Sequence, residues 1–301
     1  MNTAILTAAR QAFHKELTVL GVLSVSHRVV DKKTKRREWV ASNADISQAS
    51  SRALALHIAR QLNAPELDKG PGQTAGGQFE SAVTHFVQST FPRMAAIRPG
   101  TWTVENVGAK RSTDHIAQYH PYRHLDDLAR AIAINRELES VLGNSYVISP
   151  DIMILRDSVP DDKINEAENV VDSQSGLLSP LRLANSSSSA HTKHVHAVLS
   201  CKWTMRSDRS QHTRSEALNL IRNRKGRAPH IAAVTAEPSL SRIASLALGT
   251  GDVDMVYHAF LPELIAAVEE KGTDDAKEML ETLIHGDRLR DIADMIIDLA
   301  V

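Results

Sequence analysis

Several features that define other classes of protein are missing from this chain. It has a single cysteine, Cys201, which excludes an internal disulfide and any zinc site built from several cysteines. No hydrophobic run approaches the ~20 residues of a transmembrane helix. The N-terminal pattern has an early arginine and no small-residue cleavage site, so we expect a mature, cytoplasmic N-terminus.

Common nucleotide and metal motifs are missing too. The Gly-rich stretch at 69–91, interpreted as a loop running into a helix, has neither a G-x-G-x-x-G pattern nor a P-loop Lys-Ser/Thr. A nucleotide site is therefore disfavoured. The fourteen histidines are scattered, and the densest group, His191, His194 and His196, has no partners at the spacing of a tetrahedral site. We interpret that group as a polar strand end.

What is present is the composition of an ordinary globular protein. The 301 residues are 42% hydrophobic and 24% charged, enough for a sizeable core in one large α/β domain or two smaller ones. The formal net charge is -1, yet residues 202–227 hold eight Lys/Arg against two acids, Asp208 and Glu216. Such a stripe is typical of a surface that binds a polyanion, most often nucleic acid. A solvated helix face followed by a charged turn is the alternative.

Hydrophobic periodicity predicts a mixed α/β core with a largely helical N-terminal part. Helices are predicted at 3–20, 48–63, 122–141 and 208–223. Strands are predicted at 101–108, 146–155, 194–203, 229–235 and 252–260, with a strand or turn at 21–30.

Four segments of the chain carry further expectations. The nearly uninterrupted apolar run at 229–235 favours a buried central strand. Pro150, inside the strand run at 146–155, indicates an edge strand or an irregularity. Residues 157–193 are polar and Ser-rich, which predicts a long surface loop. The acidic stretch 261–301 is predicted to be helical, to face away from a polyanion and to close the back of the domain.

A second basic run comes early in the chain. Lys32, Lys33, Lys35, Arg36 and Arg37 precede a short polar loop with the sequence SNADIS. Serine, asparagine and aspartate are typical helix-cap residues, so a plain N-cap of the next helix is the simplest interpretation. Because the loop is short, polar and flanked by positive charge, a contact with a ligand stays open.

Two strands each present a functional group at an unusual place. Asp151 follows a proline among apolar neighbours, where a carboxylate is costly to bury unless it is paired or bound to metal. Lys202 ends another strand. A carboxylate that binds a hard divalent cation and a lysine that orients water or stabilises phosphorane charge are elements of a metal-dependent phosphodiesterase. Such sites need more carboxylate, and Glu216 and Glu80 are the candidates.

These residues resemble the PD-(D/E)XK nuclease superfamily. Pro150-Asp151 and the sequence SCK at 200–202 match its motif, except that Ser200 stands where an acidic residue is usual. In one branch of type II restriction endonucleases, which reads sites with a CCGG core, the following helix supplies that carboxylate fourteen residues after the lysine, the place of Glu216. The similarity covers most of the chain, except 157–193 and roughly 270–290. It is most specific in SNADIS, PGQTAGGQFE, CKWTMRSDRSQHTRSEALNLIRNRKGRAPHI and VTAEPSLSRIASLALGTGDVD.

The resemblance implies one α/β restriction-endonuclease-like domain over 1–301, with a PD-(D/E)XK core whose mixed central sheet is flanked by helices. Its parts would be a mainly helical segment at 1–140, the catalytic sheet core with a recognition helix at 141–260, and a helical closure at 261–301.

The resemblance also implies the catalytic residues. Asp151, Lys202 and Glu216 would form the catalytic set, assisted by Glu80. Mg²⁺ would be held by Asp151, Glu216, Glu80 and the backbone carbonyl of Cys201. A nucleophilic role for Cys201 needs an adjacent base and a lowered pKa, and the sequence indicates neither.

The segment RSDR has its own chemical interpretation. Arginine makes bidentate hydrogen bonds to guanine and aspartate accepts from cytosine, so Arg206, Asp208 and Arg209 at a helix N-terminus suit G·C pairs in the major groove. The alternative is that Asp208 caps the helix and pairs with an arginine. The resemblance favours base reading. It also implies contacts to the outer bases or the minor groove for Asp45, Ser47, Gln73 and Arg242. Lys225 and Arg227 would instead contact phosphates.

Together these features predict a Mg²⁺-dependent type II restriction endonuclease that cuts double-stranded DNA at a palindrome with a CCGG core, with GCCGGC as the candidate site. The products would carry 5′-phosphate and 3′-hydroxyl ends. A palindromic site calls for a two-fold symmetric protein, at least a dimer, and the resemblance implies a tetramer. A repair or structure-specific nuclease of the same superfamily and a non-catalytic DNA-binding module are the alternatives.

Overall fold

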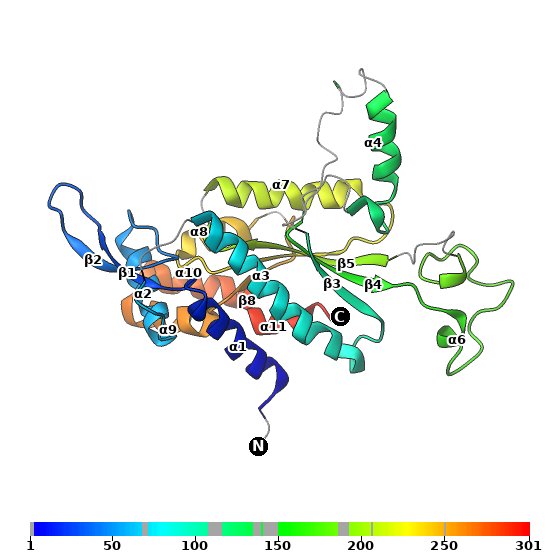
Figure 1. Ribbon diagram of the computed structural model, residues 1–301, viewed down its shortest axis with the longest axis horizontal. Coiled ribbons are helices and arrows are strands. Elements are labelled where there is room, and N and C mark those ends of the chain that lie inside the picture. The colour runs from blue at the N-terminus through cyan, green and yellow to red at the C-terminus, as the bar shows by residue number, and fades with distance from the viewer. Residues whose placement is uncertain are drawn as a thin grey trace.

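The computed structural model describes residues 3–67, 72–107, 116–134, 140, 150–185, 193–205, 207–249 and 251–301. Within these residues, six strands form one mixed sheet with helices on both of its faces (Figure 1). The order across the sheet follows the chain: β3 (Trp102–Asn106), β4 (Ile152–Asp157), β5 (Lys193–Lys202), β6 (His230–Thr235), β7 (Met255–His258) and β8 (Leu289–Asp291). The predicted α/β class, with a mixed central sheet flanked by helices, is confirmed.

The sheet changes direction at β5. Strands β3, β4 and β5 pair antiparallel, whereas β5, β6, β7 and β8 pair parallel. Parallel neighbours need crossover connections, which here are helical. These are α7 (Ser207–Asn223), α8 (Leu240–Ala247), α9 (Leu261–Lys271) and α10 (Asp274–His285). The apolar run predicted as a buried central strand is β6, whose residues after His230 are all buried.

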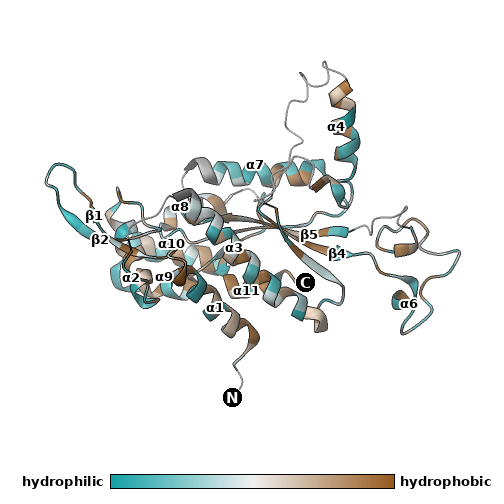
Figure 2. Cartoon of the chain, in the orientation of Figure 1, coloured by the Kyte–Doolittle hydropathy of each residue, from teal (hydrophilic) through white to brown (hydrophobic). Residues whose placement is uncertain are grey.

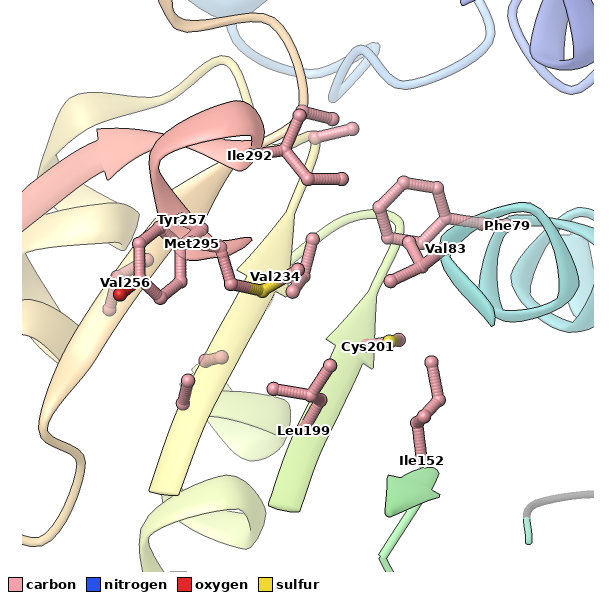
Figure 3. Close-up of a cluster of buried hydrophobic side chains, with 14 of the residues drawn as sticks. Phe79, Val83, Ile152, Leu199, Cys201, Val234, Val256, Tyr257, Ile292 and Met295 are labelled. Carbon is pink, nitrogen blue, oxygen red and sulfur yellow. The ribbon is translucent and has the colours of Figure 1, made fainter. Parts of the chain in front are cut away.

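Helices on the two faces of the sheet enclose the core. Figure 1 shows α7 and α8 on one face and α1 (Ile5–Val19), α3 (Gly72–Thr90) and α11 (Ile292–Asp298) on the other. In the core, Phe79 and Val83 of α3 and Met295 of α11 pack near Leu199, Cys201 and Val234 of the two central strands (Figure 3). Burying such side chains contributes roughly 1.5–3 kcal/mol each.

The N-terminal part also contains strands. β1 (Val25–Val29) and β2 (Arg37–Ala41) form an antiparallel hairpin apart from the main sheet. The remaining elements are α2 (Ala49–Gln61), α4 (His124–Ile134), the short helix α6 (Asp161–Ile164) and 3-10 turns at Phe91–Ala96, Ile116–Gln118 and Leu183–Asn185. Helices still predominate among the described residues of 1–140, as predicted, although β3 from this part joins the central sheet.

Several predicted boundaries are wrong, and packing explains the differences. α3 already begins at Gly72 and includes two further glycines, which cost a helix about 1 kcal/mol each but here precede the buried Phe79. β4 starts after Asp151, so Pro150 precedes the strand. Because β3 pairs with the outer side of β4, β4 is not an edge strand. The helix α8 and the strand β8 were not predicted.

The stretch predicted as a surface loop is partly ordered by its own contacts. Arg182 is buried and pairs with Asp161 at 2.7 Å, and Val159 bridges to Arg182. Residues 186–192, with His191 and the serine run, lie outside the described residues, as do the predicted helix and strand positions 135–139 and 141–149. Among the described helices, none combines the length and the apolar character needed to cross a membrane.

Candidate active site and DNA interface

The two motif residues predicted from separate strands lie side by side. Ile152 pairs with Leu199 across β4 and β5, which brings Asp151, just before β4, beside the end of β5. There the Asp151 carboxylate accepts hydrogen bonds at one oxygen, Oδ2, from the Cys201 backbone N–H at 2.7 Å and from the Lys202 ammonium at 2.8 Å. Only 3% of Asp151 is exposed. The carboxylate is therefore paired, as its burial requires.

The charges around Lys202 keep it an ammonium ion. Burial lowers the pKa of Lys202, but the negative charge of Asp151, the hydrogen bond to it and the charge of Glu216 outweigh burial and raise the pKa overall. Cys201 behaves in the opposite way. Burial, reinforced by the charge of Asp151, raises the pKa of its thiol well above the usual value. The thiol stays neutral, which contradicts a nucleophilic role and fits its place in the core (Figure 3).

Strand alternation brings Glu216 to the face of the sheet on which Ser200 and Lys202 lie. Successive side chains of a strand point to opposite faces. Cys201 lies on the α3 face (Figure 3), so Ser200 and Lys202 share the α7 face. The hydroxyl of Ser200 lies 3.4 Å from that of Thr213, and Glu216 follows one helical turn later on α7. A small pocket lined by Ser200, Thr213 and Glu216 joins these residues.

Glu80 approaches from the other side of the sheet. It lies on α3, next to the buried Phe79, and its charge reaches Cys201 and helps to raise the pKa of the thiol. Carboxylates from three elements thus gather around the end of β5. In the described part of the chain, no set of three or more His, Cys, Asp or Glu side chains has the arrangement of a preformed metal site.

The segment predicted to read bases lies a few residues after Lys202, at the start of α7. Helix α7 begins at Ser207, so the helix predicted at 208–223 is confirmed and its first turn contains Asp208 and Arg209. Arg206 and the side chains of Asp208 and Arg209 lie outside the described residues, as does the side chain of Gln73 in the first turn of α3. Base reading by these residues stays a prediction.

Three residues predicted as outer-base contacts form one cluster. Asp45 accepts hydrogen bonds at Oδ1 from the backbone and hydroxyl of Ser47, at 2.9 and 2.6 Å, and its other oxygen pairs with Arg242. The pKa of Asp45 is lowered to about 2, mainly by its hydrogen bond from the Ser47 hydroxyl. Burial opposes this shift, whereas the Ser47 N–H and Arg242 reinforce it. The interpretation of this loop as a plain N-cap is wrong, since Gln48 precedes α2.

Glu237 is a residue of this region that the sequence interpretation missed. It is fully buried, and its carboxylate accepts hydrogen bonds from the backbone N–H groups of Met205 at 2.7 Å and Ser239 at 3.0 Å. Arg242 lies 3.6 Å from the same carboxylate. Burial raises the pKa of Glu237, while these hydrogen bonds and Arg242 oppose the rise. The signal was a glutamate two residues after a strongly apolar strand, an acid among apolar neighbours like Asp151.

Glu237 therefore connects the two predicted base-reading regions. Its bond to Met205 holds the chain one residue before Arg206, and its contact with Arg242 reaches the Asp45 cluster. The predicted phosphate contacts, Lys225 and Arg227, are exposed in the turn after α7.

Two comparisons with known proteins match this chain over nearly its whole length. The family model described as the NgoMIV restriction enzyme matches residues 13–301. The type II restriction enzyme NgoMIV of Neisseria gonorrhoeae is 43% identical over 298 residues, which covers 99% of each chain. The similarity therefore includes the central sheet, α7 and the residues gathered at the end of β5.

Proposed function

The chain belongs to the NgoMIV restriction enzyme family, and from this membership we propose a Mg²⁺-dependent type II restriction endonuclease that cuts double-stranded DNA at a palindrome with a CCGG core. As a type II restriction enzyme it is a site-specific deoxyribonuclease. The observation that supports the catalytic assignment is the buried Asp151–Lys202 pair with Glu216 on the same face of the sheet. GCCGGC is the candidate site.

The residues at the end of β5 suit Mg²⁺ by their donor chemistry. Mg²⁺ prefers oxygen ligands, keeps several waters and binds through one or two carboxylates together with substrate phosphate. It therefore does not require a preformed cage of three protein ligands. Asp151 and Glu216 would hold it, with Glu80 and the Cys201 carbonyl as further ligands. When bound, the ion would supply a more acidic water and neutralise phosphate charge.

Lys202 would act through its positive charge. Since its pKa is raised, it carries a proton at neutral pH and is a hydrogen-bond donor, not a base. An ammonium group at this place orients the attacking water and stabilises the charge that develops on the phosphorane. Attack in line on the scissile phosphorus would leave 5′-phosphate and 3′-hydroxyl ends.

Recognition would be divided between two regions. Arg206, Asp208 and Arg209 at the start of α7 would read the G·C pairs of the core. Asp45, Ser47, Arg242 and Gln73 would contact the outer bases or the minor groove. Lys225 and Arg227 would bind phosphates, which adds affinity without sequence information.

The symmetry of the proposed DNA site determines the expected oligomeric state of the enzyme. A palindromic duplex has a two-fold axis, so the enzyme would act as a homodimer at least, and we propose a tetramer of two dimers that binds two sites. The proposed substrate is double-stranded DNA that the enzyme meets inside the cell, so we also propose a cytoplasmic location.

Plasmid digestion with Mg²⁺ tests this proposal. We expect discrete fragments whose ends carry the CCGG core. A smear would instead indicate a repair or structure-specific nuclease, and intact DNA that is still bound would indicate a non-catalytic DNA-binding module. Discrete fragments with ends that lack CCGG would overturn the proposed site while leaving the nuclease assignment standing.

A further inference from the structure

The hairpin of β1 and β2 carries a concentration of positive charge that the proposed active site does not use. Between positions 28 and 38 there are six basic residues and two acids, a local excess of four positive charges in a chain of net charge -1. The basic residues are Arg28, Lys32, Lys33, Lys35, Arg36 and Arg37. All except Arg28 are exposed.

The two acids of the hairpin are engaged locally. Asp31 accepts hydrogen bonds at Oδ1 from the backbone N–H groups of Lys33 and Thr34, at 2.8 and 3.3 Å, and so shapes the turn. Glu38 pairs with Arg36 at 2.8 Å and with Arg52 at 3.1 Å. Over the described ranges of the chain, no carboxylate lies within ion-pair distance of the three lysines of the turn. Their positive charge is therefore available to a ligand.

The hairpin is a stiff arm with a buried base and a charged tip. At its base, Val40 and Ala41 are fully buried in the core. Midway along, the rings of His27 and Trp39 pack across the two strands in a tilted arrangement, with centroids 5.2 Å apart. Figure 1 shows the arm extending away from the helices, and Figure 2 shows that its outer part is largely hydrophilic.

The base of the arm lies at the proposed DNA-reading edge of the protein. β2 continues into residues 42–47, where the Asn43 side chain donates to the Ala236 carbonyl at 2.8 Å and Asp45 pairs with Arg242. Ala236 directly follows Thr235, the ladder partner of Lys202. The arm therefore starts beside the catalytic edge and points outward from it.

The dimensions indicate which part of a DNA duplex the tip would meet. Five strand residues span about 17 Å, whereas a six-base-pair site covers about 20 Å of duplex, or about 10 Å on each side of its centre. From a base beside the outer-base cluster, the tip would lie beyond the end of the site. A cluster of exposed lysines at the tip suits phosphates, because contacts to the DNA backbone need positive charge and carry no sequence information.

We propose that the β1–β2 hairpin is a phosphate-binding arm that contacts the DNA backbone outside the recognition sequence. This inference rests on the proposed function for the identity of the ligand. The arm would add sequence-independent affinity and increase the salt dependence of binding, because each neutralised phosphate releases counterions. It would leave the choice of site to the residues at the start of α7 and around Arg242.

The test uses a triple variant, Lys32→Gln, Lys33→Gln and Lys35→Gln, in the full-length protein. Its binding is measured without divalent metal by fluorescence anisotropy over a range of salt concentrations. The probes are a duplex of about 30 base pairs and one of about 12, both centred on GCCGGC. The salt slope is the change in the logarithm of the binding constant with the logarithm of the salt concentration. On the long duplex we expect it to become less steep by about 5, at about 0.9 for each of the six phosphate contacts that the two arms of a dimer would lose. On the short duplex it should not change.

A matched control removes the same charge elsewhere. Lys15, Lys163 and Lys277 are exposed lysines on α1, α6 and α10, and their replacement by glutamine should leave both salt slopes at the wild-type value. Equal salt slopes for the hairpin variant and the control variant on the long duplex would overturn the proposal. A decrease in the salt slope of the hairpin variant that is the same on the long and the short duplex would also overturn it.

Failure of the proposed function gives a different result. If the wild-type protein bound a duplex with a scrambled site as tightly as GCCGGC and did not cut plasmid into discrete fragments, site-specific cleavage would be refuted. The difference in salt slope between the hairpin variant and the control variant would still show whether the arm binds the DNA backbone.

Discussion

The two ends of the central sheet differ in the polar groups that they bury. At the end where β5 and β6 finish, carboxylates are buried beside cations and N–H donors: Asp151 pairs with Lys202, and Glu237 is held by two backbone N–H groups and Arg242, with the buried imidazole of His258 next to it. At the end where these strands begin, the buried imidazole of His196 has no ion pair of this kind among the described residues. His196 lies 2.6 Å from the Leu299 carbonyl, and burial lowers its pKa to about 4.

The difference supports the proposal that the end of the sheet with Asp151 and Lys202 is the active site. A buried ion costs several kcal/mol unless partners compensate for it, so a protein that only needs stability uses neutral groups. The His196 end follows that rule: its ring packs edge-on against Trp102 at 4.8 Å. The other end buries carboxylates beside Lys202 and Arg242, cations that can also pair with a phosphate, which suits a site that binds a polyanion and metal.

Replacing Asp151 with asparagine should have the largest effect. We expect cleavage to fall about 1000-fold or more, roughly 4 kcal/mol in the barrier, because the proposed metal ligand and the partner of Lys202 are both lost. Steady-state cleavage of a plasmid measures this. The matched control is Asp157→Asn at the opposite end of β4, which should cleave at the wild-type rate. An active Asp151→Asn variant would refute the site assignment.

Replacing Glu237 with glutamine should have an intermediate effect. An amide cannot accept from both the Met205 and Ser239 N–H groups and also attract Arg242, so the free energy of unfolding should fall by about 1–3 kcal/mol. Because Glu237 is a positioning residue, the turnover number should fall more than the Michaelis constant rises, and cleavage of sites with altered outer bases should increase relative to the preferred site.

The control for that experiment is Glu278→Gln on the exposed face of α10, which should change neither stability nor site preference. A Glu237→Gln variant with reduced stability but unchanged site preference would assign Glu237 a purely structural role.

Acid should destabilise the protein through the histidine end. Burial lowers the pKa of His196 from 6.5 to about 4, so the native state binds fewer protons than the unfolded chain. The stability from keeping His196 neutral is fully present above about pH 6.5 and is lost as the pH falls towards 4, up to about 3 kcal/mol in all. Urea unfolding over this range measures it. His196→Gln should flatten the pH dependence, and an unchanged slope would contradict the explanation.

Changing Cys201 should have the smallest effect. Its thiol is buried in the core and its pKa is raised well above the usual value, so iodoacetamide at about pH 8 should label the sole cysteine only after unfolding. Cys201→Ala should retain full cleavage and lose about 1 kcal/mol of stability. Loss of cleavage without loss of stability would show that the thiol takes part in the reaction.

Local signals in the sequence were sufficient for the elements that carry the candidate site. The helix α7 and the strands β5 and β6 were predicted within about two residues, because their periodicity or apolar character is strong. β8 was missed because it has three residues and depends on pairing with β7. The early start of α3 was missed because packing of its later turns outweighs the local preference of its glycines.

The sequence by itself determined the chemistry of the site: a proline-aspartate pair, a lysine at a strand end, a glutamate fourteen residues later and the RSDR segment. Only the tertiary structure decided how these residues meet. The alternation of β5 set Lys202 on the α7 face with Glu216, and the packing of α8 paired Arg242 with Asp45 across 197 positions. Such pairings depend on the direction and packing of elements distant in the chain, and a local pattern contains no information about either.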